Sequence, residues 1–264
     1  MTSFAFYNLK GGVGKTTTCV NLAYLCAQEG YRTLLWDVDP QGAASFYCQS
    51  NGEGLNGHAV EIFSAQRAVH PHIESTAYPN LDLISGDVDI RNWDLVLDSL
   101  KSKNKRVKGV LASVKRNYDF IFIDCPPSLS RLAENLFRGA DFVLFPMIPS
   151  PLSQRTFQQV TQFFGEKDFD ARKLFPFFNL VDRRRTLHKT IMAQFHAELP
   201  RTLDTYIPNS AMVERMGTEQ KPLPAYAAKH AITTNLRQLW QEVKLLRKPK
   251  SRKRLAAGRA NRFR

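Results

Sequence analysis

The glycine-rich segment at residues 8–18 constrains the fold of this 264-residue sequence more than any other feature. It reads Asn-Leu-Lys-Gly-Gly-Val-Gly-Lys-Thr-Thr-Thr, and Gly14-Lys15-Thr16 is how a phosphate-binding loop ends. A short apolar stretch, residues 3–7, precedes the loop, and a stretch with helical spacing of apolar residues, 17–28, follows it. Strand, glycine loop and helix in this order are the setting of a P-loop. The sequence therefore predicts a bound nucleoside triphosphate.

The loop is suited to phosphate because its backbone N–H groups point into one concavity. Glycines adopt backbone angles closed to other residues, and the N-terminus of the next helix adds partial positive charge. Lys15 is expected to reach the β- and γ-phosphates of ATP, and the Thr16 hydroxyl to ligate Mg²⁺. The residues predicted to contact the nucleotide are Gly11, Gly12, Val13, Gly14, Lys15, Thr16 and Thr17.

Carboxylates stand at the ends of two further predicted strands. Asp37 and Asp39 lie at the end of the strand expected over residues 33–38, and Asp124 ends the apolar run 120–124. Ligand sites gather at the carboxyl ends of strands in open α/β sheets. We expect Asp124 to lie close to Mg²⁺ through a water molecule. The alternative for Asp37 and Asp39 is a solvated turn in which an Asp caps a helix.

The combined pattern resembles the ParA/MinD family of deviant Walker A ATPases. Position 9, a glycine in the usual loop, is Leu9 here, and a second lysine, Lys10, follows it. In that family the extra lysine reaches the nucleotide held by the partner in a dimer, so the resemblance implies that Lys10 acts in trans. It implies a catalytic set of Lys10, Lys15 and Asp39, with Asp39 orienting the attacking water. It also places Asp37 near Mg²⁺, through water. The alternative for Lys10 is a solvated surface lysine.

The resemblance implies two further parts of the site. Residues 124–127, Asp-Cys-Pro-Pro, match the family's switch II, which senses the γ-phosphate. Asn179 and Pro208 match positions that line the adenine pocket in the family. Asn and Pro are also ordinary loop residues, and that is the alternative for both.

Strand and helix patterns alternate along the chain, which predicts a mostly parallel twisted sheet with helices on both faces. We divide the chain into an ATPase domain, residues 1–246, and a basic tail, residues 247–264, expected to be disordered. Other expected elements are helices over 59–69, 87–100, 106–116 and 227–246 and a strand over 203–206.

The charge distribution points to nucleic acid. The net charge is +13, and residues 244–264 hold ten basic residues and no acidic ones. A basic arm favours sequence-independent binding to DNA phosphates. Further candidates are Arg183, Arg184, Arg185, Arg201, Arg215 and Arg237. The alternative for Arg183–Arg185 is a solvated loop.

The sequence matches two other functions of this family, membrane binding and electron transfer, less well. The MinD branch binds membranes through a C-terminal amphipathic helix, but here Pro249 breaks the helix and large apolar residues are few beyond it. An electron-transfer relative needs cysteine ligands for a cluster, and the four cysteines lack metal-ligand spacing. Without a recognisable signal peptide or apolar span, we expect a cytoplasmic, nucleoid-associated protein. The resemblance implies an ATP-dependent homodimer and a partner protein that stimulates hydrolysis.

Overall fold

The computed structural model describes residues 1–50, 52–100 and 105–247. The predicted basic tail, residues 247–264, lies outside the described residues except for Arg247.

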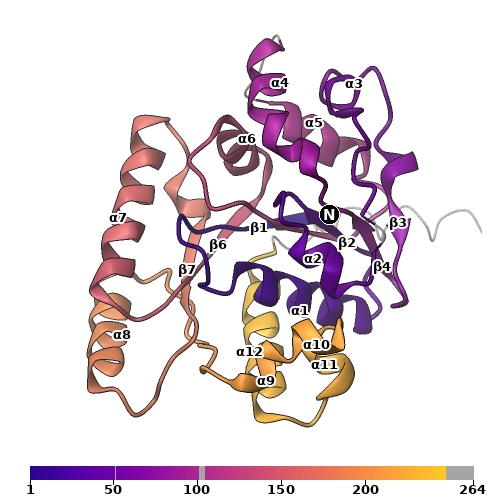
Figure 1. Ribbon diagram of the computed structural model, residues 1–264. Helices are drawn as coiled ribbons and strands as arrows, with labels where there is room; N and C mark the ends of the chain where they lie inside the picture. The colour runs from indigo at the N-terminus through magenta and orange to yellow at the C-terminus, as the bar shows by residue number, and fades with distance from the viewer. Residues whose placement is uncertain (51, 101–104, 248–264) are drawn as a thin grey trace, which may run out of the picture.

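The described residues form one sheet of seven strands in the order β3-β4-β2-β5-β1-β6-β7 (Figure 1). All neighbouring pairs are parallel except β3 with β4, which are antiparallel at one edge. The strands are β1 (Thr2–Phe6), β2 (Thr33–Asp37), β3 (Glu74–Ser75), β4 (Leu81–Ile84), β5 (Phe120–Asp124), β6 (Phe142–Met147) and β7 (Leu174–Phe178). The predicted mostly parallel α/β fold is confirmed.

Helices connect the strands and cover both faces of the sheet (Figure 1). The α-helices are α1 (Lys15–Gln28), α2 (Ala43–Tyr47), α3 (Ala59–Phe63), α4 (Trp93–Ser99), α5 (Arg106–Ser113), α6 (Arg131–Gly139), α7 (Pro151–Glu166), α8 (Thr186–Glu198), α9 (Ala211–Glu214), α10 (Met216–Glu219), α11 (Leu223–Tyr226) and α12 (Ala231–Leu245). Short 3₁₀ helices are η1 (His70–His72), η2 (Val88–Asn92) and η3 (Ala171–Lys173).

The central strand β5 shows how the sequence builds two cores. Its five residues are all buried, as expected for a parallel strand covered on both faces. Because side chains alternate along a strand, Ile121 and Ile123 join the core beneath α3–α8, whereas Phe120 and Phe122 join the core beneath α1 and α12. Trp240 of α12 packs edge-on against Phe120, with ring centroids 5.3 Å apart. This packing holds β5, which ends in Asp124, against α12 in the middle of the sheet.

Three predicted helices differ from the observed ones. The helix expected over 59–69 ends at Phe63, and Ala65 has a left-handed φ of 63° that a helix cannot continue through. The helix expected over 87–100 begins as η2 and becomes α-helical only at Trp93. The helix expected over 227–246 begins at Ala231, after the separate short helix α11.

The strand predicted over residues 203–206 does not form. Leu203 N–H donates to Pro176 O, and Ile207 N–H donates to Phe178 O, each at 2.9 Å. The two donors are four residues apart, whereas their two acceptors in β7 are only two residues apart. The segment therefore cannot pair with β7 in a regular ladder. The segment follows β7 as an extended loop that delivers Pro208 to the carboxyl edge of the sheet.

Candidate nucleotide-binding site

The glycine-rich loop lies where β1 ends in the middle of the sheet, with α1 beginning at Lys15. Asn8 anchors its start: the buried side chain donates from Nδ2 to Pro146 O at 2.8 Å, and its Oδ1 accepts from Lys10 N–H at 2.9 Å. Gly12 and Gly14 have φ values of 71° and 86°, a region that favours glycine. The strand–loop–helix arrangement predicted from the sequence is therefore present, and the loop is fastened to β6.

Asn179 supports this loop from behind. Its side chain is buried, and Nδ2 donates to Val13 O at 2.8 Å. A Cβ atom built on Gly14 would lie only 2.1 Å from the same Nδ2. The sequence reasoning assigned Asn179 to the adenine pocket, which stays a prediction. Its contact with the loop backbone was missed, because residues 166 positions apart show no joint pattern.

We predict that Gly14→Ala destabilises the protein and weakens ATP binding. A left-handed backbone costs a non-glycine residue about 1–2 kcal/mol, and the Asn179 amide must also move. Melting temperature and ATP affinity measured on the same preparation should both fall, by about 2–4 °C for each kcal/mol. Gly11→Ala is the matched control, since its Cβ would meet no atom within 4 Å. Equal melting temperatures for the two variants would contradict the prediction.

The two lysines of the loop lie in different settings. Lys15 is 7% exposed, and its Nζ donates to Lys10 O at 3.2 Å, so its ammonium lies inside the loop. Lys10 contacts the loop through its backbone and is partly exposed. Burial lowers the pKa of Lys10 below its ordinary value. One ammonium therefore lies inside the glycine loop, and the other lysine stands at the rim.

Asp37 is fully buried and organises the loop that follows β2. One oxygen accepts from Ser45 N–H at 2.9 Å and from the Ser45 hydroxyl at 2.7 Å, and the other accepts from Asp39 N–H at 3.2 Å. Burial raises the pKa of Asp37, and the bonds from Ser45 oppose that shift. Asp39 is half-buried, and its Oδ1 accepts from Gln41 N–H at 3.0 Å. Asp37 thus fixes α2 and the backbone of Asp39, and its predicted place near Mg²⁺ stays a prediction.

Asp124 is different from Asp37, although the two are paired in register across β2 and β5. It is fully buried, and neither carboxylate oxygen has a hydrogen-bond partner among the described residues. Burial, and next the charge of Asp37, raise the pKa of Asp124, while the nearby Thr16 hydroxyl and Lys15 ammonium lower it. A buried carboxylate without partners is costly unless a cation compensates it.

A magnesium ion fits this setting. Within the part of the chain that the structure describes, no group of three or more His, Cys, Asp or Glu side chains could hold a metal. Mg²⁺ differs from most metals in this respect, because it keeps several waters and is held by one or two carboxylates together with substrate phosphates. Asp124 and the Thr16 hydroxyl, at the mouth of the glycine loop, are such a set.

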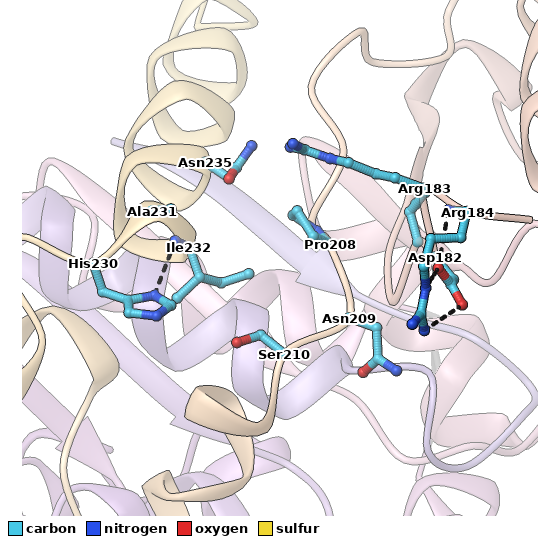
Figure 2. Close-up of a pocket in the computed structure, with 11 residues that line it drawn as sticks. Asp182, Arg183, Arg184, Pro208, Asn209, Ser210, His230, Ala231, Ile232 and Asn235 are labelled. Atoms are coloured by element: carbon cyan, nitrogen blue, oxygen red, sulfur yellow. Dashed lines mark hydrogen bonds and ion pairs between the residues drawn. The ribbon is translucent and has the colours of Figure 1, made fainter.

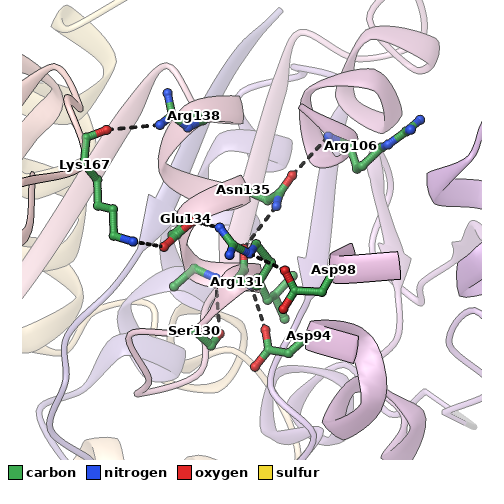
Figure 3. Close-up of polar contacts among 11 residues, drawn as sticks. Asp94, Asp98, Arg106, Ser130, Arg131, Glu134, Asn135, Arg138 and Lys167 are labelled. Carbon is green, nitrogen blue, oxygen red and sulfur yellow. Dashed lines mark hydrogen bonds and ion pairs between the residues drawn. The ribbon is translucent and has the colours of Figure 1, made fainter. Parts of the chain in front are cut away.

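The loop after β5 leads into α6, whose start is capped from two sides (Figure 3). The Ser130 hydroxyl accepts from Ala133 N–H at 3.4 Å. Asp94 of α4 accepts from Leu132 N–H at 2.8 Å. Carboxylates are favourable at a helix N-terminus, where N–H groups lack partners. The loop after Asp124 is therefore bounded at its far end by a helix that α4 holds in place.

An ion network fixes the same helix along its side (Figure 3). Arg131 pairs with Asp98 of α4 at 2.8 Å and with Glu134. Glu134, only 7% exposed, also receives Lys167 from the end of α7 at 3.0 Å. None of these residues was singled out in the sequence, because their partners come from separate helices.

Pro208, the second residue predicted for the base pocket, lies beside a cavity. It lines a cavity of about 410 Å³ between the loop after β7 and the start of α12 (Figure 2). Arg183 and Asn235 point toward each other across this cavity. Asn179 is not among its lining residues. The structure thus has Asn179 against the glycine loop and Pro208 at the cavity, and the adenine pocket expected for both residues stays a prediction.

Comparisons with known proteins agree with this geometry. The sequence model of a family described as an AAA domain matches residues 1–172. The chain is 30% identical to the chromosome partitioning protein ParA of Caulobacter vibrioides over 90% of its own length and 92% of that protein. It is similar to a solved structure described as a plasmid partition protein from Borrelia burgdorferi bound to AMPPNP, with TM-score 0.76, 21% identity, and 93% and 99% of the two chains covered. The septum site-determining protein MinD of Pyrococcus horikoshii, complexed with Mg-ADP, matches with TM-score 0.74, 20% identity, and 93% and 96% covered.

Proposed function

The chain belongs to the ParA/MinD family of P-loop ATPases, and we propose that it works as an ATP-dependent dimer that binds DNA non-specifically and positions or segregates a cargo. The observation that carries the proposal is the glycine loop with two lysines in different settings. Lys15 lies within the loop, and Lys10 stands partly exposed at its rim. The cargo is a plasmid, a chromosomal locus or a protein assembly.

The nucleotide part of the proposal assigns ATP to the glycine loop. Residues 11–17 enclose the phosphates, with Lys15 donating to their β- and γ-oxygens. Mg²⁺, held by the Thr16 hydroxyl and through water by Asp124, supplies positive charge that neutralises the phosphate oxygens. Structures of similar fold support this assignment, since one is described with AMPPNP and another with Mg-ADP. Pro208, at the edge of its cavity, and Asn179 are proposed to face the base and ribose side.

The dimer part assigns a separate role to Lys10. A rim lysine that contacts its own loop only through the backbone is free to reach a nucleotide held by a second copy. We assign to Asp39, half-buried beside the buried Asp37, the role of orienting the water that attacks the γ-phosphate. Hydrolysis then depends on dimer formation, so it is slow in the isolated chain, and a partner protein that stimulates it sets the lifetime of the dimer.

The DNA part of the proposal rests on exposed arginines that have no ion pair among the described residues. Arg184 is paired with Asp182 at 3.1 Å, and Arg215 with Glu219 at 2.8 Å. Arg183 and Arg185, by contrast, are exposed and have no ion pair among the described residues. They follow β7, next to the cavity that Pro208 lines. We propose that these two arginines bind DNA phosphates together with the basic tail.

DNA binding of this kind places the protein in the cytoplasm, on the nucleoid. A MinD-like role at a membrane is the competing proposal. The described residues contain no helix that is both long and apolar enough to span a bilayer. Binding of the full chain to anionic vesicles but not to DNA would favour the membrane role.

We expect the full chain with Mg²⁺ and a non-hydrolysable ATP analogue to sediment as a dimer and to bind duplex DNA of any sequence. With ADP it should be monomeric and bind weakly. The Arg183→Ala/Arg185→Ala double variant should lower the slope of log affinity against log salt by about 2, because each phosphate contact contributes about 0.9. Fluorescence anisotropy over a range of salt concentrations measures this slope.

The matched control removes the same charge elsewhere. Lys115 and Arg116 are exposed and precede the amino end of β5, whereas Arg183 and Arg185 follow the carboxyl end of β7. The Lys115→Ala/Arg116→Ala variant should keep the slope of the unmodified protein. An equal loss of slope in both double variants would show that only total charge matters, and an ATP-independent monomer would overturn the proposed function.

A further inference from the structure

Tyr7 joins the glycine loop to the loop after β5. It follows β1 directly and precedes Asn8, the residue that anchors the glycine loop. The side chain is completely buried, and its hydroxyl donates to Ser128 O at 3.0 Å. Its ring packs edge-on against Phe137 of α6, with centroids 4.6 Å apart. One side chain thus contacts both the loop after Asp124 and the helix into which that loop runs.

The hydroxyl is a permanent donor. Burial, and after it the neighbouring Cys125, raise the pKa of Tyr7 above its ordinary value, so the phenol keeps its proton at neutral pH. The segment it holds has little freedom of its own. Pro126 and Pro127 fix two φ angles, and Ser128 N–H donates to Pro126 O at 3.0 Å. Cys125 N–H donates to Phe6 O at 3.2 Å and holds the start of this segment to β1, and the Tyr7 hydroxyl holds its middle at Ser128 O.

We propose that Tyr7 is a positioning residue that fixes residues 125–130 relative to the phosphate-binding loop. This segment can then respond differently to ATP, which has a γ-phosphate, and to ADP, which has none. The inference rests on the proposed function and on the family resemblance, which implies that residues 124–127 sense the γ-phosphate. Tyr7 itself does not contact the nucleotide.

The geometry explains why one strand serves both loops. The Asn8 side chain accepts a hydrogen bond from Lys10 N–H in the glycine loop. The hydroxyl of Tyr7, one residue earlier, donates to Ser128 O in the loop after β5. Any displacement of the end of β1 would move both contacts together. The far end of the segment is held separately, where Asp94 caps Leu132. Loss of the Tyr7 hydroxyl should therefore release the middle of residues 125–130, while the bond from Cys125 N–H to Phe6 O and helix α6 stay in place.

The test compares Tyr7→Phe with Tyr118→Phe. Each substitution removes one phenol hydroxyl that donates a hydrogen bond, and Phe keeps the ring. Tyr118 is also buried, and its hydroxyl donates to Asp82 at 2.7 Å, near the amino end of β5 and away from the site. Amide hydrogen exchange of residues 125–131 is measured by mass spectrometry in the full chain without nucleotide, with Mg-ADP, and with Mg²⁺ and a non-hydrolysable ATP analogue. Affinities for both nucleotides are measured in parallel.

Without nucleotide, we expect exchange in residues 125–131 to be at least about threefold faster in Tyr7→Phe than in the unmodified protein, with β1 unchanged. The difference in exchange between the ATP analogue and ADP should fall by about half or more, while affinity for each nucleotide stays within about threefold. Tyr118→Phe should leave all three readouts unchanged.

Two outcomes would overturn the inference. One is unaltered exchange of residues 125–131 in Tyr7→Phe. The other is faster exchange throughout β1 and α6, which would show a purely structural role. Failure of the proposed function looks different, because the unmodified protein would then bind neither nucleotide. The nucleotide-free comparison would still decide whether Tyr7 holds the segment.

Discussion

Lys15→Ala should abolish ATP binding at ordinary nucleotide concentrations. Lys15 is only 7% exposed, and its ammonium already lies inside the loop, where it donates to Lys10 O. Charge-assisted hydrogen bonds to phosphate are worth roughly 1.5–3 kcal/mol each, and Lys15 is proposed to make two. Since 1.4 kcal/mol is tenfold, affinity should fall by a factor on the order of 100 or more. Calorimetric titration with a non-hydrolysable ATP analogue and Mg²⁺ measures the loss.

Lys10→Ala is the matched control within the same loop. Its backbone N–H, which Asn8 holds, remains in the variant, so the loop should keep its shape. ATP affinity of the monomer should therefore stay within about threefold, which is less than 1 kcal/mol. Hydrolysis should be lost, because the proposed partner contact is missing. A loss of affinity equal to that of Lys15→Ala would mean that Lys10 serves its own nucleotide and would contradict action in trans.

Local sequence was enough to predict the parts of the site that are contiguous in the chain. The order of strand, glycine loop and helix appears in residues 2–28 as expected, because φ-permissive glycines and a following helix are local properties. The run 120–124 is likewise the buried central strand that its unbroken apolar pattern predicts. Both segments carry their structural information in adjacent residues.

The supports of the site could not be predicted, because each one joins distant segments. The Tyr7 hydroxyl meets Ser128, and the Asn179 amide meets Val13, and neither pair shows a pattern in the sequence. The two aspartates at strand ends were treated alike, yet Asp37 has its oxygens occupied and Asp124 does not. Only the position of Ser45 at the start of α2, a helix that was not predicted, makes that distinction.

The predictions of one short strand and of one helix start were wrong for a related reason. Residues 203–206 include Thr and Tyr, which favour strands, but a strand needs a partner in register. The bonds from Leu203 and Ile207 to β7 are spaced unequally, so no regular pairing forms. The break before Ala231 depends on His230, whose ring accepts from Ile232 N–H at 3.2 Å and caps α12. Histidine is an uncommon cap, so propensity alone extends the helix too far toward the N-terminus.

Asp124→Asn should stabilise the nucleotide-free protein. The substitution removes a buried negative charge that has no hydrogen-bond partner among the described residues. Relief of about 1 kcal/mol would raise the melting temperature by about 2–4 °C, measured in EDTA without nucleotide. Asp37→Asn should act in the opposite direction, because an amide cannot accept all the bonds from Ser45 and Asp39 N–H. The two variants remove the same charge from paired positions on neighbouring strands.

The Asp124 carboxylate also makes the free energy of unfolding depend on pH. Because its folded pKa is raised above the ordinary value of 3.8, the folded protein binds more protons than the unfolded chain in the range between the two values. Stability should therefore fall as pH rises from 3.8 through the raised pKa and stay lower above it. Asp37, whose pKa is also raised, contributes in the same direction. Asp124→Asn should flatten this decline in part, as urea titrations over the acid range would show.

With ligand present, the effect of Asp124→Asn should reverse. The gain in ATP affinity that Mg²⁺ gives the unmodified protein should fall by about tenfold or more, since the amide no longer offers the cation a charge. Thermal shifts with ATP alone and with Mg-ATP measure this gain, because a ligand that binds only the folded state stabilises it in proportion to the logarithm of its affinity. A variant that is more stable alone but less stabilised by Mg-ATP identifies a carboxylate kept for the cation. If Mg-ATP stabilised the Asp124→Asn variant as much as the unmodified protein, Asp124 would not be part of the magnesium site.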